Sequence, residues 1–144
     1  MAKYTQNEVK VGAVIFLDPD VLRSNGSAST TAGKGMAVTG HHYFVVIALK
    51  GSQVTLAPLF SDNPSQVREG LDAAVKSGSE ARWLGSDSYL EKHQYWSADV
   101  ADVCTASSVD ATSPGSRNGY GGATSFAALV PAIGSGTWRS LYPK

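Results

Sequence analysis

The three histidines are the side chains best suited to chemistry near neutral pH. His41 and His42 are adjacent and stand just before an apolar run, and His93 lies further along the chain. Two imidazoles that face one phosphate can cleave RNA without a metal, because one removes the 2′-hydroxyl proton and the other protonates the leaving oxygen. A cation must also stabilise the charge on the phosphate. The sequence offers three candidates for this cation: Arg82, Lys92 and Arg117.

The spacing of the histidines does not favour a metal site. Adjacent residues on a strand point to opposite faces, so His41 and His42 would share an ion only if they lay in a loop. A catalytic zinc site can be built from three histidines, but the chain lacks His-x-His and His-x-x-x-His spacing. We therefore expect neither a metal nor another cofactor.

Other reactive groups rank lower. Cys104 would be a nucleophile if it were paired with a histidine, but the predicted strand around it favours a small core residue. As the single cysteine, it also excludes a disulfide framework. Residues 32–35 resemble part of a phosphate loop, yet Ala28 stands where that motif needs glycine and Gly35 where it needs serine or threonine.

Aromatic and basic side chains alternate between residues 82 and 96. Such an arrangement could stack bases and contact phosphates of a nucleic acid. The same rings could instead pack inside the fold, and the sequence favours packing without excluding binding. The candidate binding residues in this stretch are Arg82, Lys92, Tyr95 and Trp96.

Length and composition predict one domain over residues 1–144. The chain is 42% hydrophobic and 17% charged, which is enough apolar material for a core. Its 12 basic and 12 acidic residues cancel, so a nucleic acid or an anionic membrane would need a local basic patch to bind. The polar N-terminus lacks a signal sequence, and no apolar run approaches the ~20 residues that span a bilayer. We expect a cytoplasmic protein without membrane contact.

Apolar runs separated by turn residues predict a mostly-β fold. The strongest strands are expected over residues 9–17, 43–49 and 53–60, and Lys50-Gly51-Ser52 supplies the turn between the last two. Asn63 as a cap, Pro64 at the first position and apolar spacing of three and four predict one helix over residues 63–77. Shorter strands are expected over 81–84, 88–90, 94–98 and 102–106, with long Gly/Ser-rich loops over 23–40 and 107–122. This order favours a small β-barrel or a strongly bent sheet.

Three segments of the first 62 residues carry a family resemblance: VGAVIFLDPD, GHHYFVVIAL and QVTLAPLFSD. Their order and composition resemble the PemK/MazF-like group. In that group a Gly-hydrophobic-Val strand, a long loop, a Val- and Leu-rich strand and a strand ending in a Pro-Ile-Thr-Ser-like segment follow one another. The resemblance implies a small, partly open SH3-like barrel. Because many members are toxins of toxin–antitoxin systems, it also implies a metal-independent endoribonuclease.

The resemblance also implies particular site residues. The family pattern has an arginine at the start of the second strand and a hydroxyl residue at the end of the third. This chain has His41-His42 at the first place, and Phe60 followed by Ser61 at the second. These differences favour a catalytically degenerate binding module for RNA or a protein partner. In the alternative, an endoribonuclease, His42 would be acid or base, His93 its counterpart and Ser61 would orient the phosphate. An apolar edge strand could also pair two copies into a homodimer.

Overall fold

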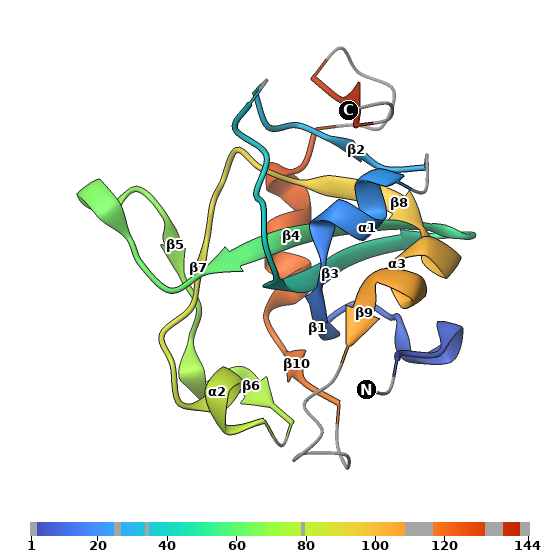
Figure 1. Cartoon of the computed structure of the whole chain (residues 1–144). Helices are drawn as coiled ribbons and strands as arrows, with labels where there is room; N and C mark the ends of the chain where they lie inside the picture. Colours follow the sequence, from blue (N-terminus) through green and yellow to red (C-terminus); the bar gives the residue numbers. More distant parts are fainter. Residues whose placement is uncertain are drawn as a thin grey trace.

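The computed structural model describes residues 3–24, 27–33, 35–78, 80–108, 117–131 and 137–141, and it is dominated by antiparallel strands (Figure 1). The strands of the main sheet are β1 (Val14–Leu17), β2 (Ser29–Thr30), β3 (His42–Lys50), β4 (Gln53–Phe60), β5 (Glu69–Gly70), β7 (Tyr89–Leu90), β8 (Trp96–Asp99), β9 (Ser107–Ser108) and β11 (Arg139–Ser140). Their order is β11-β2-β8-β4-β3-β1-β9, and β5 and β7 pair beside the end of β4. Over the described residues this nine-stranded sheet does not close into a barrel.

The β3–β4 hairpin at the centre of the sheet is the one predicted from the sequence. Its turn contains Gly51 with φ of 60°, a conformation that glycine adopts without a steric cost. On its other edge β3 pairs with β1, in a register that runs from Val14 opposite Val45 to Leu17 opposite His42. The prediction that these three segments are neighbours is therefore confirmed. β1 is shorter than predicted, because residues 10–13 form a turn in which the amide of Ala13 donates to the carbonyl of Lys10.

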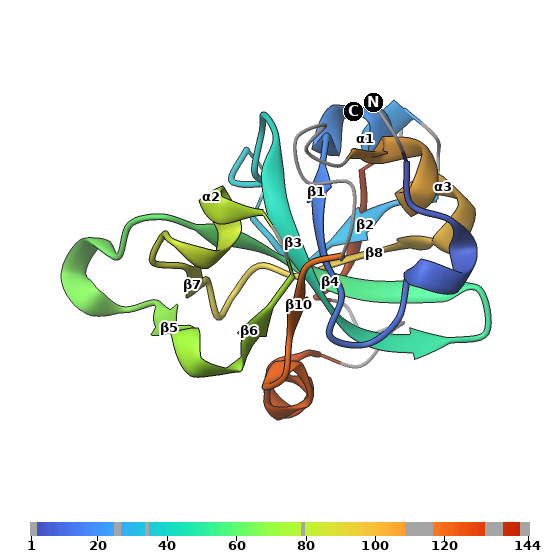
Figure 2. The ribbon, with the colours of Figure 1, turned by 90° about the horizontal axis from the view of Figure 1, so that it is seen from below.

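Both faces of the sheet are buried, which explains the uninterrupted apolar run in β3. Phe44 and Val46 point into one hydrophobic cluster, and Val45 and Ile47 point into another on the opposite face. The helices α1 (Pro19–Ser24) and α3 (Val100–Ala106) cover the first cluster. The 3-10 helix η4 (Ala123–Leu129) and α2 (Ala81–Leu84) pack against the second. Figure 2 shows η4, the orange-red coil, on the side of the central strands opposite α1 and α3.

The helix predicted over residues 63–77 is absent, and this prediction is wrong. The segment consists of the 3-10 turns η2 (Pro64–Gln66) and η3 (Ala73–Val75) and the short strands β5 and β6 (Lys76–Ser77). Two of the apolar residues on the predicted stripe, Val67 and Val75, are 61% and 41% exposed, and Leu71 is only partly buried against the second cluster, so burial does not favour a continuous helix here. Gln66 has φ of 56°, which interrupts helical backbone, and Asp72 caps a separate turn by accepting from the amide of Ala74.

Two further assignments also differ from the structure. The strands predicted over residues 81–84 and 102–106 are α2 and most of α3, because Val103 and Ala106 bury one helical face at a spacing of three. The predicted loop over 23–40 contains β2 and is tied down by Arg23, whose guanidinium donates to the carbonyl of Val38 at 2.9 Å. The predicted loop over 107–122 begins with β9 and contains β10 (Gly119–Tyr120), which pairs with β6. Residues 109–116 of that loop lie outside the described residues.

None of the helices in the described parts of the chain combines the length and the apolar character needed to cross a bilayer.

The buried hydroxyl of Tyr95 leads to a first prediction. Tyr95 is 1% exposed, and its hydroxyl has no hydrogen-bond partner among the described residues. Tyr95→Phe removes a desolvated polar group and keeps the ring, so the free energy of unfolding should stay equal or rise by about 1 kcal/mol in a urea titration. Tyr4→Phe is the matched control: the Tyr4 hydroxyl donates to the carbonyl of Val14, and its loss should cost about 1 kcal/mol. A clear destabilisation by Tyr95→Phe would contradict this account.

A second prediction concerns acid stability. Arg117 donates from Nε to Glu8 Oε2 at 2.7 Å, and this bond, helped by the amide of Thr5, lowers the pKa of Glu8 from 4.5 to about 2. A lowered carboxyl pKa stabilises the fold above pH 4.5, and that stabilisation is lost as the pH falls to about 2. Because the Glu8 side chain is 30% exposed, we expect Glu8→Gln to cost only about 1 kcal/mol near neutral pH.

The test compares urea unfolding of wild type and variant at both ends of this pH range. The difference between the two proteins should vanish near the acid end. Glu69→Gln is the control, because the Glu69 carboxylate is half exposed and its contact with Lys92 is long, at 3.9 Å. A Glu8→Gln difference that persists unchanged in acid would contradict the assignment.

Candidate functional site

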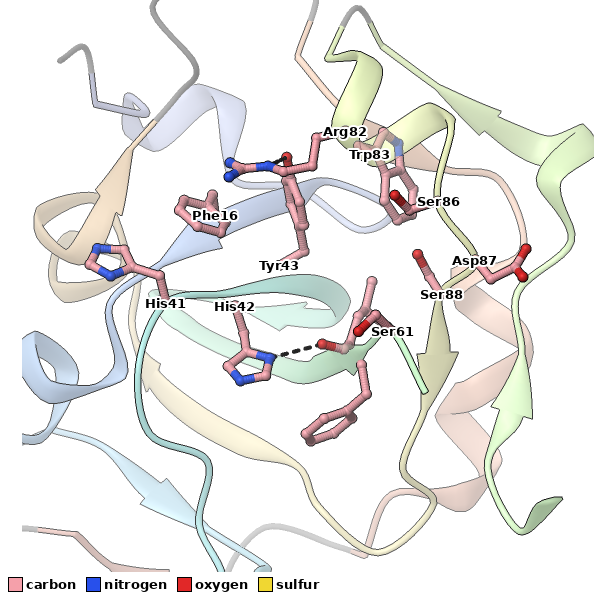
Figure 3. A pocket seen from close by; sticks show the side chains of 12 residues that line it. Phe16, His41, His42, Tyr43, Ser61, Arg82, Trp83, Ser86, Asp87 and Ser88 are labelled. Atoms are coloured by element: carbon pink, nitrogen blue, oxygen red, sulfur yellow. Dashed lines mark hydrogen bonds between the residues drawn. The ribbon is translucent and has the colours of Figure 1, made fainter. Parts of the chain in front are cut away.

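A pocket of about 330 Å³ opens where β3 begins and β4 ends, beside α2 and the loop that follows it (Figure 3). Four of the residues singled out from the sequence line it: His41, His42, Ser61 and Arg82. The other lining residues are four aromatic side chains, Phe16, Tyr43, Phe60 and Trp83, together with Leu59, Ser86, Asp87 and Ser88. We call this cavity the histidine pocket. Its volume lies in the range of sites that hold a small ligand.

The pairing of β3 explains how two adjacent histidines reach one pocket from different sides. Side chains alternate along the strand, so His41 and Tyr43 lie toward Phe16, whereas His42 lies toward Phe60. The His41 ring stacks on Phe16 with 5.3 Å between centroids, and the His42 ring meets Phe60 edge-on at 5.2 Å. The two imidazoles therefore line opposite walls.

A hydrogen bond to the main chain orients His42. Its Nδ1 lies 3.0 Å from the carbonyl oxygen of Leu59, a group that can only accept. Nδ1 must therefore carry the proton, and in the neutral ring the lone pair of Nε2 is left to accept another. Figure 3 shows this contact as a dashed line at the lower wall. The arrangement prepares His42 for proton transfer at Nε2.

Arg82 is placed at the upper wall by a chain of hydrogen bonds that runs from its exposed guanidinium inward to the buried Glu80. Its Nε donates to the hydroxyl of Tyr43 at 3.3 Å, and its guanidinium carbon lies 4.5 Å from the centre of the Phe16 ring. The Tyr43 hydroxyl donates to Glu80 at 2.9 Å, and Asn118 donates to the second oxygen of that carboxylate. Burial raises the pKa of Tyr43 to about 12, so the hydroxyl keeps its proton. Glu80 itself is 3% exposed, which makes it a fixed anchor under the site.

Lys76 holds the remaining wall, residues 83–88. Its Nζ donates to the carbonyls of Trp83 and Ser86 at 3.0 and 2.7 Å and to Ser88 Oγ at 3.1 Å. It also lies 4.1 Å above the Trp83 ring. Burial lowers the pKa of Lys76. Because all three ammonium protons are used, Lys76 stabilises the wall and is not itself a binding group.

His93 and Lys92 lie elsewhere. His93 lines a second pocket of about 370 Å³ together with Arg68, Glu91 and Gln94. Phe60 belongs to both cavities, but His93 is not among the residues around the histidine pocket. The geometry therefore pairs His42 with His41 and not with His93, the counterpart expected from the sequence. Lys92 is exposed and lines neither cavity.

Tyr95 and Trp96 are core residues, which corrects their expected role in binding. They are 1% and 0% exposed. Trp96 packs edge-on against Phe44 and donates from its indole to Gln94 at 2.9 Å. Neither ring offers an open face on which a base could stack. Of the aromatic and basic residues that alternate in this stretch, Tyr95 and Trp96 thus pack in the core, whereas Arg82 lines the histidine pocket.

Sequence reasoning missed several supporting residues. Phe16, Tyr43 and Trp83 were assigned to strands or to packing, and Glu80 and Lys76 carried no signal. For Tyr43, the only sign in the sequence of a place in the site was its position next to the two histidines at the start of a predicted strand. Cys104 lies on α3 and is partly buried, and burial raises the pKa of its thiol, which opposes a nucleophilic role. Within the described residues, no three His, Cys, Asp or Glu side chains are grouped as metal ligands.

Comparison with known proteins gives no assignment. No family model matches the chain, and no curated protein or solved structure matches it either.

The bond between His42 and Leu59 leads to a third prediction. In the neutral imidazole of His42, nitrogen-15 NMR shifts should show the proton on Nδ1, because the Leu59 carbonyl accepts from that atom. His93 is the internal comparison, since its backbone amide donates to Glu91 and its carbonyl accepts from Thr31. A His42 spectrum typical of the Nε2–H form would contradict the geometry.

Proposed function

We propose that the histidine pocket binds single-stranded RNA and that the chain is a catalytically degenerate, PemK/MazF-like binding module. The observation that carries the proposal is that Arg82, His41, His42 and Ser61 line one aromatic-walled pocket. A nucleotide presents an anionic phosphate beside a flat base, and this pocket offers a group for each.

Arg82 and Ser61 are the groups suited to the phosphate. The guanidinium is planar and permanently charged, and it forms short, strong hydrogen bonds with phosphate oxygens. Ser61 is exposed at the end of β4 and can add a hydroxyl donor. Because basic and acidic residues cancel over the whole chain, binding rests on these local contacts. Affinity should therefore fall only moderately with salt, as expected for one or two neutralised phosphates.

His41 is the group suited to the base. One face of its ring stacks on Phe16, and the side chain is 51% exposed. Its outer face can therefore receive a base, as histidine rings do in proteins that bind single strands. A volume of about 330 Å³ suits one nucleotide and not the broad surface of a protein partner.

The proposal includes the fold expected from the resemblance, a divergent and partly open SH3-like barrel. What supports it is the side-by-side order of β1, β3 and β4, with the site at the ends of β3 and β4. The first strand, the long connection and the hairpin follow in the order that the resemblance implies.

Metal-independent cleavage of RNA is a second candidate, favoured by the orientation of His42. With Nδ1 bound to Leu59, Nε2 can take the proton of a 2′-hydroxyl. The oxygen then attacks the adjacent phosphorus, and the 5′-oxygen leaves with a proton from His41. The products are a 2′,3′-cyclic phosphate and a free 5′-hydroxyl. Arg82 would stabilise the charge that develops on the phosphate.

Binding is tested by fluorescence anisotropy with labelled, mixed-sequence single-stranded RNA. Arg82→Ala should weaken binding about tenfold or more, because a charge-assisted hydrogen bond is worth about 1.5–3 kcal/mol. Lys92→Ala is the matched control, since it removes one positive charge from an exposed position outside the pocket. Circular dichroism should show that both variants fold. Equal affinities for the two variants, or no binding by wild type, would overturn the proposal.

Cleavage is read from the same RNA on a denaturing gel in the presence of a chelator. If the second candidate holds, the wild type produces fragments with cyclic phosphate ends, and His42→Ala removes them. RNA that binds and stays intact would reject cleavage and leave the binding module standing.

A further inference from the structure

The second pocket lies directly beside the histidine pocket. Its apolar walls include Met36, which is 72% exposed, and the buried Val38. The polar groups around it are Arg68, Glu91, His93 and Gln94. At about 370 Å³ it matches its neighbour in size. No role has been assigned to it so far.

Phe60 is the wall shared by the two pockets, and it is held in place from two directions. The His42 ring meets it edge-on from the histidine pocket. The guanidinium carbon of Arg68, which lines the second pocket, lies 4.0 Å from the centre of the ring. Phe60 is therefore the side chain that a ligand occupying both pockets would contact from each side.

The charge of the second pocket does not suit a phosphate. Among the described residues that line it, the one permanent cation is Arg68, which donates from Nη1 to the Asp62 carboxylate at 2.7 Å and has its Nε 3.6 Å from the carboxylate of Glu91. Two acids thus balance the guanidinium. An incoming phosphate would face Glu91 with little attraction to compensate for the loss of its water.

The second pocket offers what a nucleobase needs, a flat apolar contact and a hydrogen-bonding edge. Met36 and Phe60 supply apolar surface. The backbone of His93 is fixed, because its amide donates to Glu91 and its carbonyl accepts from Thr31. The exposed imidazole stands on this rigid support. Glu91 keeps further acceptor capacity on its carboxylate for the amino or imino groups of a base.

We propose that the second pocket binds the base of the nucleotide next to the one held in the histidine pocket. The ligand unit is then a dinucleotide of single-stranded RNA that passes Phe60, with its phosphate at Arg82 and its second base against Met36 and His93. This inference rests on the proposed function of the histidine pocket, and it assigns His93 to base recognition instead of proton transfer.

The test compares ligand lengths by competition against the labelled RNA. The probes are the four nucleoside 5′-monophosphates and the four matching 5′-phosphorylated homodinucleotides. The best dinucleotide should bind about tenfold or more tightly than its mononucleotide, because stacking of one base contributes about that much. His93→Ala and Met36→Ser should each remove most of this gain and leave mononucleotide affinity unchanged. Arg82→Ala should weaken both kinds of ligand.

Two further measurements separate binding from a general effect on the fold. Leu129→Ser is the control, since Leu129 is an exposed apolar side chain on η4 that lines neither pocket, and it should change nothing. The NMR signals of the His93 ring should shift with a dinucleotide and stay in place with a mononucleotide.

The possible failures are distinguishable. If mononucleotides and dinucleotides bind equally well and the His93 and Met36 variants behave as wild type, the second pocket is not a base site, while the proposed function stands. If no ligand of either length competes and labelled RNA does not bind, the proposed function fails and this inference falls with it.

Discussion

The pairing of β3 with β1 on one edge and β4 on the other is the constraint on which the rest of the structure depends. Phe44, Val45, Val46 and Ile47 are at most 2% exposed, and burial of each such side chain contributes roughly 1.5–3 kcal/mol. Strands on both sides satisfy the backbone of β3, so a shift in its register would break this pairing and disrupt the packing of its apolar residues in both clusters. The histidines precede and begin this fixed strand, and their positions follow from its register.

The histidine pocket lies where the apolar sheet meets a small network of hydrogen-bonded polar side chains around Glu80, the residue just before α2. Glu80 is buried, and a buried carboxylate is tolerated only when its oxygens are hydrogen-bonded. Tyr43 and Asn118 supply those bonds, from β3 and from the residue before β10. Removing Tyr43 or Asn118 would leave one oxygen of Glu80 without its hydrogen bond. Removing Tyr43 would also remove the hydroxyl to which Arg82 donates. The hydrogen bonds that satisfy the buried Glu80 thus also hold the Tyr43 hydroxyl that positions Arg82.

The sequence predicted the parts of the fold that local pattern determines. The β3–β4 hairpin followed from two apolar runs and a glycine turn, and β1 from an apolar run that ends at Asp18-Pro19. The prediction of a helix over 63–77 failed because the apolar spacing was helical while the core covers only part of the stripe: Leu71 packs against it, whereas Val67 and Val75 are exposed. For the site, His42 and Ser61 were predictable as strand ends. The contact of Glu80 with Asn118 joins residues 38 positions apart and leaves no local pattern.

Phe60 matters for both proposed functions, cleavage and binding, because its side chain lines both pockets. In the resemblance to the PemK/MazF-like group, a hydroxyl residue stands where this chain has Phe60. A hydroxyl can orient a phosphate, whereas a ring held between His42 and Arg68 can only shape the space on either side of it. Phe60 thus forms a wall common to two pockets, while the neighbouring Ser61 keeps a hydroxyl at the end of β4. The shared wall supports the proposed role in holding RNA, because it gives a longer ligand surface on both sides of one ring. The proposed alternative, cleavage, is supported by a different feature, the Nε2 of His42 that its bond to Leu59 leaves oriented for proton transfer.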